Sequence, residues 1–174
     1  MMRTLVYPPS SRPVVMGTEG MVSTGNPLAS MAGVRVLAEG GNAFDAAVAV
    51  AFMLGVVEPY MSGPGGTGTA ILRLADEPRF RALDFSGRTP VAATRSELSE
   101  EAIDLGMMAP MMVPGNVAGW LTIHEAYGSM NRENLFAPAI GYAENRFPVT
   151  HWCSQVMNDH VERLRTFPSS AAII

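Results

Sequence analysis

The sequence predicts an α+β domain that is rich in helices, and three observations support this prediction. Residues 27–57 contain two consecutive helical patterns, and the second of them, at 43–57, has Asp45 as its only charged residue. Residues 67–85 contain two β-prone runs on either side of a turn. Further helical patterns follow between residues 116 and 165. We therefore expect one domain over the whole chain, with more helix than strand.

Length and composition limit the class of protein. The 174 residues suit one domain with a real core, and residues 1–13 are rich in proline and serine and should be irregular. A net charge of −4 gives no electrostatic footprint for nucleic acid. The start of the chain lacks the apolar run of about 7–15 residues that is typical of a secretory signal. The apolar stretch at 43–57 is shorter than the roughly 20 residues that cross a bilayer. We expect a cytoplasmic protein with no membrane partner.

The first two helices carry their own start signals. Asn26 is a good N-cap, and Pro27 stands at the first helical position, where a missing N–H costs nothing. A Gly-Gly pair ends this helix. Asn42 caps the next helix, with Asp45 in its first turn, where the helix dipole favours a carboxylate. A helix that is apolar on every side must be buried on most of them, so we expect this helix at the centre of the core.

Strands are expected on both sides of this helix pair. Short β-prone runs stand at 14–16 and 20–24, and longer ones at 67–74 and 80–85, where an Ala-Asp-Glu-Pro turn makes a hairpin. The following residues should form a mixed loop with a short helix at 97–105.

Helices are then expected at 116–127, 132–144 and 151–165. Their boundaries follow from single residues. We expect Asn131 and Thr150 to be N-caps, Gly128 and Asn145 to end helices in the C′ position, and Pro138 to bend the middle helix, since it removes one ladder bond.

Several sequence blocks stand in one order between residues 20 and 147. They are G-N-A-F-D-A-A-V-A at 41–49, E-P-Y-M-S-G-P-G-G at 58–66, A-L-D-F at 82–85, V-P-G-N-V-A-G at 113–119, Y-G at 127–128, A-P-A-I at 137–140 and A-E at 143–144. Together they resemble the N-terminal part of the gamma-glutamyltranspeptidases, also called glutathione hydrolases. The resemblance implies an N-terminal-nucleophile hydrolase, a four-layer αββα sandwich, of which this chain would be the helix-rich N-terminal portion.

The resemblance also implies a chemistry without metal or cofactor. Members of the family cleave themselves before a threonine, whose free α-amine then activates its own hydroxyl as the nucleophile. A gamma-glutamyl group passes to this hydroxyl and then to water, an amino acid or a peptide. The family's Thr-Thr-His-x-Ser motif does not occur in this sequence. Thr150 and His151 resemble this motif only superficially, and we expect Thr150 to cap a helix.

The chain is therefore expected to be an N-terminal fragment of a gamma-glutamyltransferase or glutathione hydrolase that is inactive by itself. Its partners would be a glutathione-like gamma-glutamyl substrate and a C-terminal portion, or small subunit, that carries the threonine. Such a fragment should expose a contiguous apolar patch of more than a few hundred Å². Two alternatives remain, namely a non-catalytic module of the same fold and a related acylase with a different acyl donor.

One substrate-binding residue, Arg88, is predicted within the chain. The family pattern after the second strand is D-F-R-E-x-A-P, and its arginine binds the α-carboxylate of the gamma-glutamyl group, a task suited to a guanidinium fork. Here Asp84 is followed two positions later by Ser86 where the family has arginine, and Gly87 stands where it has glutamate. Arg88 stands two positions after the place of the family's arginine. Either it reaches the same pocket, or it is a loop arginine that pairs with Asp84 or is solvated.

Other candidate residues have plainer explanations. The glycine-rich turn at 62–68 follows a helix and lacks Gly-Lys-Ser/Thr, so we expect it to pass close to neighbouring backbone and reach positive φ rather than hold a phosphate. His124, His151 and His160 have no metal-ligand spacing, and the single cysteine, Cys153, should be a packed thiol.

Overall fold

The structure is a computed structural model and describes residues 14–91, 93–94 and 112–173. The expected irregular start at 1–13 and the expected short helix at 97–105 lie outside these residues. In chain order the elements are α1 (Pro27–Ala38), α2 (Ala43–Val57), β1 (Thr69–Arg73), β2 (Phe80–Asp84), α4 (Asn116–Tyr127), α5 (Arg132–Asn145), α6 (His151–Arg165) and α7 (Pro168–Ala171).

Local capping explains where α1 and α2 begin. The Asn26 side chain accepts the N–H of Leu28 at 2.9 Å. Asn42 accepts the N–H groups of Phe44 and Asp45, while the Asp45 carboxylate accepts the N–H of Asn42, so that a complete capping box opens α2. Both predicted N-caps are confirmed.

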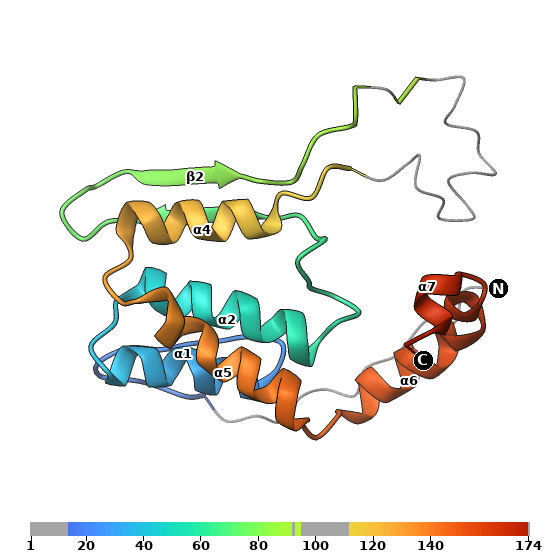
Figure 1. Cartoon of the computed structure of the whole chain (residues 1–174). Helices are drawn as coiled ribbons and strands as arrows, with labels where there is room; N and C mark the ends of the chain where they lie inside the picture. The colour runs from blue at the N-terminus through green and yellow to red at the C-terminus, as the bar shows by residue number, and fades with distance from the viewer. Residues whose placement is uncertain (1–13, 92, 95–111, 174) are drawn as a thin grey trace.

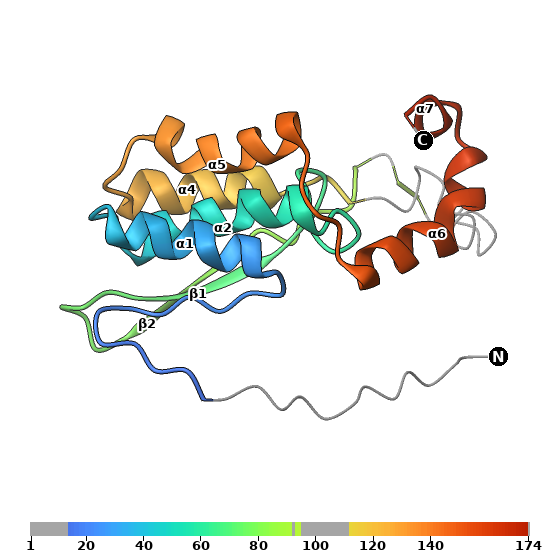
Figure 2. The same cartoon turned by 90° about the horizontal axis from the view of Figure 1, so that it is seen from below.

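Helix α2 lies at the centre of the helical layer and packs against α1, α4 and α5 (Figures 1 and 2). Its buried Val48 and Ala49 contact Val36 of α1 and Leu135 of α5, and its Met53 fills the space beside α1. Ala43, in the first turn, is the one residue of α2 that is exposed. The predicted burial of this helix on most sides is therefore confirmed.

Strands β1 and β2 form the predicted hairpin, which lies against α4 (Figure 1). The strands are antiparallel, with Thr69 opposite Asp84 and Arg73 opposite Phe80. The strands predicted at 14–16 and 20–24 are wrong, because both segments are irregular. A β-prone run becomes a strand only when another strand satisfies its N–H and C=O groups, and among the described residues the sheet contains β1 and β2 alone.

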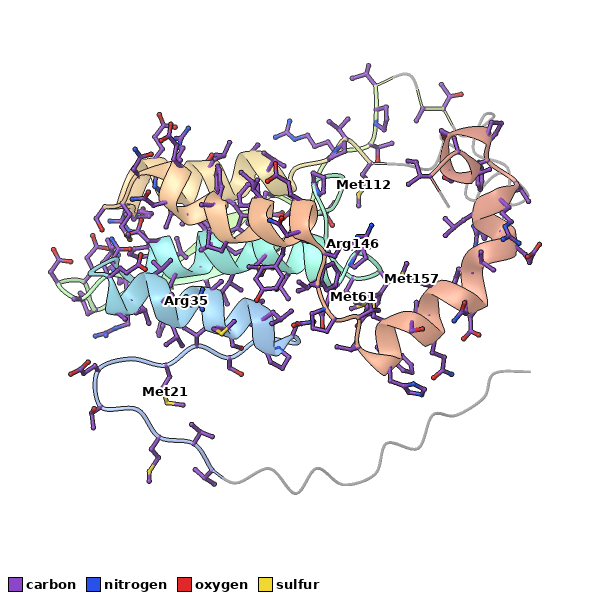
Figure 3. All side chains as sticks on the ribbon, turned by 60° about the horizontal axis from the view of Figure 1, so that its bottom comes forward. Met21, Arg35, Met61, Met112, Arg146 and Met157 are labelled. Carbon is purple, nitrogen blue, oxygen red and sulfur yellow. The ribbon has the colours of Figure 1, made fainter. Side chains whose placement is uncertain are left out.

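Two predicted helix ends are wrong in detail. Gly128 follows α4 with a φ of −69°, so it is not left-handed. Asn145 is the last residue of α5, which continues past Pro138, and the positive φ falls on Arg146 (φ 70°, ψ 166°) at the junction with α6 (Figure 3). This backbone region is almost exclusive to glycine and costs about 1–3 kcal/mol for other residues.

Helices α6 and α7 extend away from the other helices (Figures 1 and 2). Thr150 caps α6 as predicted, since its Oγ1 accepts the N–H of Cys153 at 3.2 Å, whereas the short α7 was not predicted. Among the described residues, no helix has the length and apolar character needed to span a bilayer.

Large apolar side chains are exposed on several elements. They include Ile71 and Phe80 on the hairpin, Met61 just before the glycine-rich turn and Met157 on α6; Figure 3 labels the two methionines. The expected contiguous apolar patch remains a prediction, because the exposures of single residues do not give the area of a joined surface.

Candidate functional site

A hollow of about 590 Å³ opens where β2 ends beside the first turns of α4. One wall is the segment from Leu83 to Val91, which includes Asp84 and Arg88. The other wall is formed by residues 113–115 and by the side of α4 that carries Gly119. The hollow therefore contains the segment in which the sequence predicted a substrate-binding arginine.

Phe85 sets the depth of this hollow. Its ring is buried and meets Trp120 edge-on, with 5.5 Å between ring centroids. Three glycines allow the surrounding chain to approach Phe85. A Cβ atom on Gly68 or Gly119 would lie less than 3.0 Å from atoms of the ring, and one on Gly115 would lie 2.3 Å from the carbonyl oxygen. Two of these glycines belong to the V-P-G-N-V-A-G block, so their close approach to Phe85 explains why that block has glycine at both positions.

Asn116 attaches the glycine-rich turn to the start of α4. Its side-chain amide donates to the carbonyl of Gly63 at 2.7 Å, its backbone N–H donates to Gly66, and its Oδ1 accepts the indole N–H of Trp120. The expectation of positive φ in this turn is wrong, because among the described glycines only Gly40 and Gly87 have it. Hydrogen bonds to Asn116 shape the turn instead, and no sequence pattern indicated this role for Asn116.

Asp84 and Ser86 form a local pair at the rim of the hollow. The carboxylate Oδ1 of Asp84 accepts both the N–H of Ser86 at 3.0 Å and its hydroxyl at 2.6 Å. The hydroxyl bond first, and then the backbone bond, lower the pKa of Asp84. Asp84 is therefore a carboxylate at neutral pH with one of its oxygens held in place.

Gly87 turns the chain so that Arg88 faces the hollow. Gly87 has a φ of 91°, and a side chain there would strike the carbonyl of Val113. Arg88 then forms an isolated antiparallel bridge, in which its carbonyl accepts the N–H of Val113 at 2.9 Å. No ion pair between the described residues joins Arg88 to Asp84, so the expected alternative of an Asp84–Arg88 pair is wrong.

A second polar cluster joins the start of α2 to the α4–α5 connection. The fully buried Asp45 accepts the hydroxyl of Ser129 at 2.6 Å and the N–H groups of Ser129, Met130 and Asn42. Burial alone would raise the pKa of Asp45, but these hydrogen bonds outweigh it and lower the pKa. A side chain at Gly128 would also be crowded, because its Cβ atom would lie 2.5 Å from the His124 ring, 2.6 Å from the His124 carbonyl oxygen and 2.9 Å from Asp45 Oδ1.

This cluster contains serine, histidine and aspartate but lacks the arrangement of a nucleophile with its base. The Ser129 hydroxyl donates to Asp45 and not to His124. His124 has its Nε2 2.9 Å from the carbonyl of Met130, and its Nδ1 accepts Arg132 Nε at 3.2 Å, so both ring nitrogens are engaged. Ser129 is therefore a structural residue that holds α2 to the connection.

The remaining candidates also occupy structural positions. Cys153 is buried, with its sulfur 3.8 Å from that of Met157, and burial followed by the charge of Glu58 raises its pKa. Thr150 caps α6. Among the residues that the structure describes, no three His, Cys, Asp or Glu side chains are grouped as a metal site.

Comparisons with known proteins agree on one family. The family model described as Gamma-glutamyltranspeptidase matches residues 29–174. The chain is 37% identical over 161 residues to the glutathione hydrolase-like YwrD proenzyme of Bacillus subtilis (strain 168), covering 91% of this chain and 31% of that protein. It is 36% identical over 170 residues to the acylase ACY 1 proenzyme of Pseudomonas sp. (strain V22), covering 91% of this chain and 30% of that one.

Solved structures give the same result. The gamma-glutamyltranspeptidase of Helicobacter pylori matches with a TM-score of 0.80 and 35% identity, over 91% of this chain and 47% of that one. The cephalosporin acylase of Bacillus halodurans matches with a TM-score of 0.78 and 34% identity, over 94% of this chain and 31% of that one. The chain thus spans less than a third of the length of the curated relatives described above.

Replacing Gly119 by alanine should destabilise the protein, because the new Cβ atom would overlap the Phe85 ring. Overpacking of this kind costs about 1–3 kcal/mol, measurable as a lower urea midpoint. Gly141→Ala is the matched control, since Gly141 is also inside a helix but has open space around it. It should be neutral or stabilising by up to about 1 kcal/mol. Equal effects of the two substitutions would contradict the proposed role of Gly119.

Asp45 should make the stability of the protein depend on acid pH. Because its pKa in the folded state is below the ordinary 3.8, the stability that it contributes is complete above that value and is lost as the pH falls through the lower, folded pKa. Asp45→Asn should therefore be less stable than the wild type at pH 7 and lose less stability than the wild type below about pH 5. Urea unfolding at several pH values measures both. If the free energies of unfolding of the wild type and of Asp45→Asn changed in parallel with pH, Asp45 would not be held ionised by the cluster.

Proposed function

Because this chain belongs to the gamma-glutamyltranspeptidase family, we propose that it is the N-terminal part of an enzyme that cleaves gamma-glutamyl amide bonds. In this proposal the chain supplies a helical scaffold and the hollow that receives the acyl donor. The nucleophilic threonine comes from polypeptide outside these residues, in the C-terminal portion or small subunit of a complete enzyme. Glutathione-like compounds are the proposed substrates.

The observation that carries this proposal is the position of Arg88. It lines a hollow of suitable size for a small molecule, beside the strand end where the family pattern has its arginine. Among the described residues that line the hollow, it is the only cation. A guanidinium can bind a carboxylate through two parallel hydrogen bonds, which suits the α-carboxylate of a gamma-glutamyl group.

The hydroxyl groups of Ser129 and Thr150 and the thiol of Cys153 are not activated as nucleophiles, which supports the proposal of an external threonine. Ser129 is bonded to a carboxylate of lowered pKa, which is a poor base, and Thr150 accepts a backbone N–H as a helix cap. The raised pKa of Cys153 keeps its sulfur protonated. None of the three has the adjacent free base that acyl transfer requires.

We further propose that the helices form one outer layer of an αββα sandwich and that the hairpin is part of the adjoining sheet. A lone two-stranded hairpin is at best marginally stable in water. Here β1 and β2 have unpaired outer edges among the described residues, and Ile71 is 77% exposed on the hairpin. Additional strands from the rest of the enzyme would pair these edges and cover this side chain.

A second candidate function is that of an acylase with a different acyl donor. Ser86 and Gly87 replace the arginine and glutamate of the family pattern, and the Ser86 side chain is occupied by Asp84. Relatives of similar identity include proteins named acylases. The same replacements would also suit a module that keeps the fold without the chemistry.

The purified 174-residue chain should release no aniline from a gamma-glutamyl anilide, because it lacks an activated hydroxyl. Absorbance of the released aniline measures this directly. Activity that survives purification and disappears with a substitution inside this chain would refute the external nucleophile.

The coding DNA gives an independent check, since an open frame beyond Ile174 with Thr-Thr-His-x-Ser supports the enzyme and a frame without it supports the non-catalytic module.

In the complete enzyme, Arg88→Ala should raise the KM for gamma-glutamyl substrates about tenfold or more, because a charge-assisted bidentate contact is lost. Arg79→Ala, in the turn of the hairpin, is the matched control and should leave the KM unchanged. Steady-state kinetics of both variants measure the effect. An unchanged KM in Arg88→Ala would remove Arg88 from the site.

A further inference from the structure

We propose that the chain has a second binding site, which takes a small carboxylate with an aromatic or alkyl body. The site is a cavity of about 280 Å³ between α2, α4 and α5, here called the α2–α5 cavity. The apolar body of the ligand occupies this cavity, and its carboxylate binds Arg146 at the end of α5. The cavity shares no lining residue with the hollow beside β2, and this proposal does not rest on the proposed function.

The wall of the α2–α5 cavity is apolar and partly aromatic. Phe52 of α2 and Phe136 of α5 both line it, with 4.3 Å between their ring centroids, and Trp120 lines it from α4. None of its described lining residues carries a charge. An apolar cavity of about 150 Å³ holds one benzene molecule. The α2–α5 cavity, at about 280 Å³, therefore has room for an aromatic ring and a short chain.

The polar groups in this wall already bind one another. The side-chain amide of Asn116 donates to the carbonyl of Gly63 at 2.7 Å, and its Oδ1 accepts the indole N–H of Trp120 at 2.8 Å. A polar group of a ligand that entered the cavity would lose its bonds to water and find these partners occupied. The wall thus favours the apolar end of a ligand.

Arg146 stands where the cavity meets the end of α5. Ala143 in the last turn of α5 lines the cavity, and Arg146 follows it by three residues, the spacing of neighbours on a helix surface. The next residue, Phe147, packs against the cluster that contains Val57 of α2. This packing holds the α5–α6 junction beside the last turn of α2, whose Val56 also lines the cavity.

The backbone of Arg146 supports a role for its side chain. Its φ of 70° and ψ of 166° suit glycine, so arginine at this position is strained. The residue is exposed, and none of the ion pairs between the described residues includes it. A guanidinium that has no such pair can bind a carboxylate through two parallel hydrogen bonds. Strain on the backbone is then the cost of placing this cation at the junction.

The charges around the cavity define the class of ligand. The carboxylate of Glu58, at the end of α2, lies against Gly25 and does not line the cavity. An uncharged apolar cavity with one cation at its end is complementary to a ligand that has an apolar body and one negative charge. A neutral molecule of the same shape would fill the cavity and leave Arg146 without a partner.

The test is a titration of the 174-residue chain with 3-phenylpropionate and with 3-phenylpropionamide, followed by NMR. The signals to follow are the indole N–H of Trp120 and the backbone amides of Phe52, Gly55 and Gly63. The wild type should bind the carboxylate about tenfold more tightly than the neutral amide, because a charge-assisted contact is present only with the carboxylate.

Three variants separate the two parts of the site. Arg146→Gln should lose the preference for the carboxylate and keep the affinity for 3-phenylpropionamide. Arg146→Gly should lose the same preference while its urea midpoint rises, since glycine relieves the backbone strain. Ala143→Phe should weaken the binding of both probes, because the new ring at this exposed position occupies the end of the cavity.

The controls are Arg163→Gln on α6 and Ala38→Phe at the end of α1, which are exposed and away from the cavity. Both should bind the probes as the wild type does, and the same spectra show whether each variant is folded. If neither probe shifts the four reporter signals, or if the shifts fall on residues 84–89 alone, the α2–α5 cavity is refuted as a site. If the wild type has no preference for the carboxylate, or if Arg146→Gln keeps it, the role of Arg146 is refuted.

Discussion

The contact on which the candidate site depends is the packing of Phe85 beside three glycines, two of which meet its ring and one its carbonyl group. One glycine comes from the glycine-rich turn before the hairpin, and the other two come from the start of α4, where Gly115 and Gly119 face the same side because they are four residues apart. The ring thereby fixes the hairpin, the turn and α4 to one another. Since Asp84 and Ser86 are its immediate neighbours on either side, their positions follow from its packing. A change that displaced this ring would move both walls of the hollow together.

A buried charge supports the other end of the same helical layer. Asp45 lies at the start of α2, yet the donors that hold it come from the connection between α4 and α5, more than eighty residues later in the chain. This carboxylate therefore has two tasks, since it completes a capping box and also anchors a distant segment. Such a group stabilises the fold only while it is ionised and fully hydrogen-bonded, because an unpaired buried carboxylate would be strongly destabilising. The two contacts, one apolar and one charged, attach α4 at both of its ends.

Much of the fold could be predicted from the sequence, because its signals are local. The caps at Asn26, Asn42 and Thr150 depend on a few adjacent residues, and the apolar character of α2 is visible in its own composition. The errors arose where distant contacts decide. The strands expected before α1 have no described partner, and the glycine after α4 is required by close contact with His124 and Asp45 rather than by a left-handed turn. For the candidate site, the sequence indicated Arg88 and its unusual neighbours, but it could not show that Asp84 binds Ser86 instead of Arg88. The bond between Ser86 and Asp84 spans only two residues and is of the kind that aspartate side chains make in turns, whereas the bridge between Arg88 and Val113 joins distant segments that no local pattern encodes.

The arrangement of the hollow separates residues that support the fold from residues that only line its wall. Phe85 and its glycines are constrained by steric fit, whereas Ser86, Arg88 and Thr89 line the hollow with little or no part in the core. Substitutions at these three positions should therefore cost little stability. If the hollow receives the acyl donor, as proposed, acyl preference can change at these positions while Phe85 keeps its packing, which would fit the nearly equal similarity of this chain to a glutathione hydrolase-like protein and to proteins named acylases.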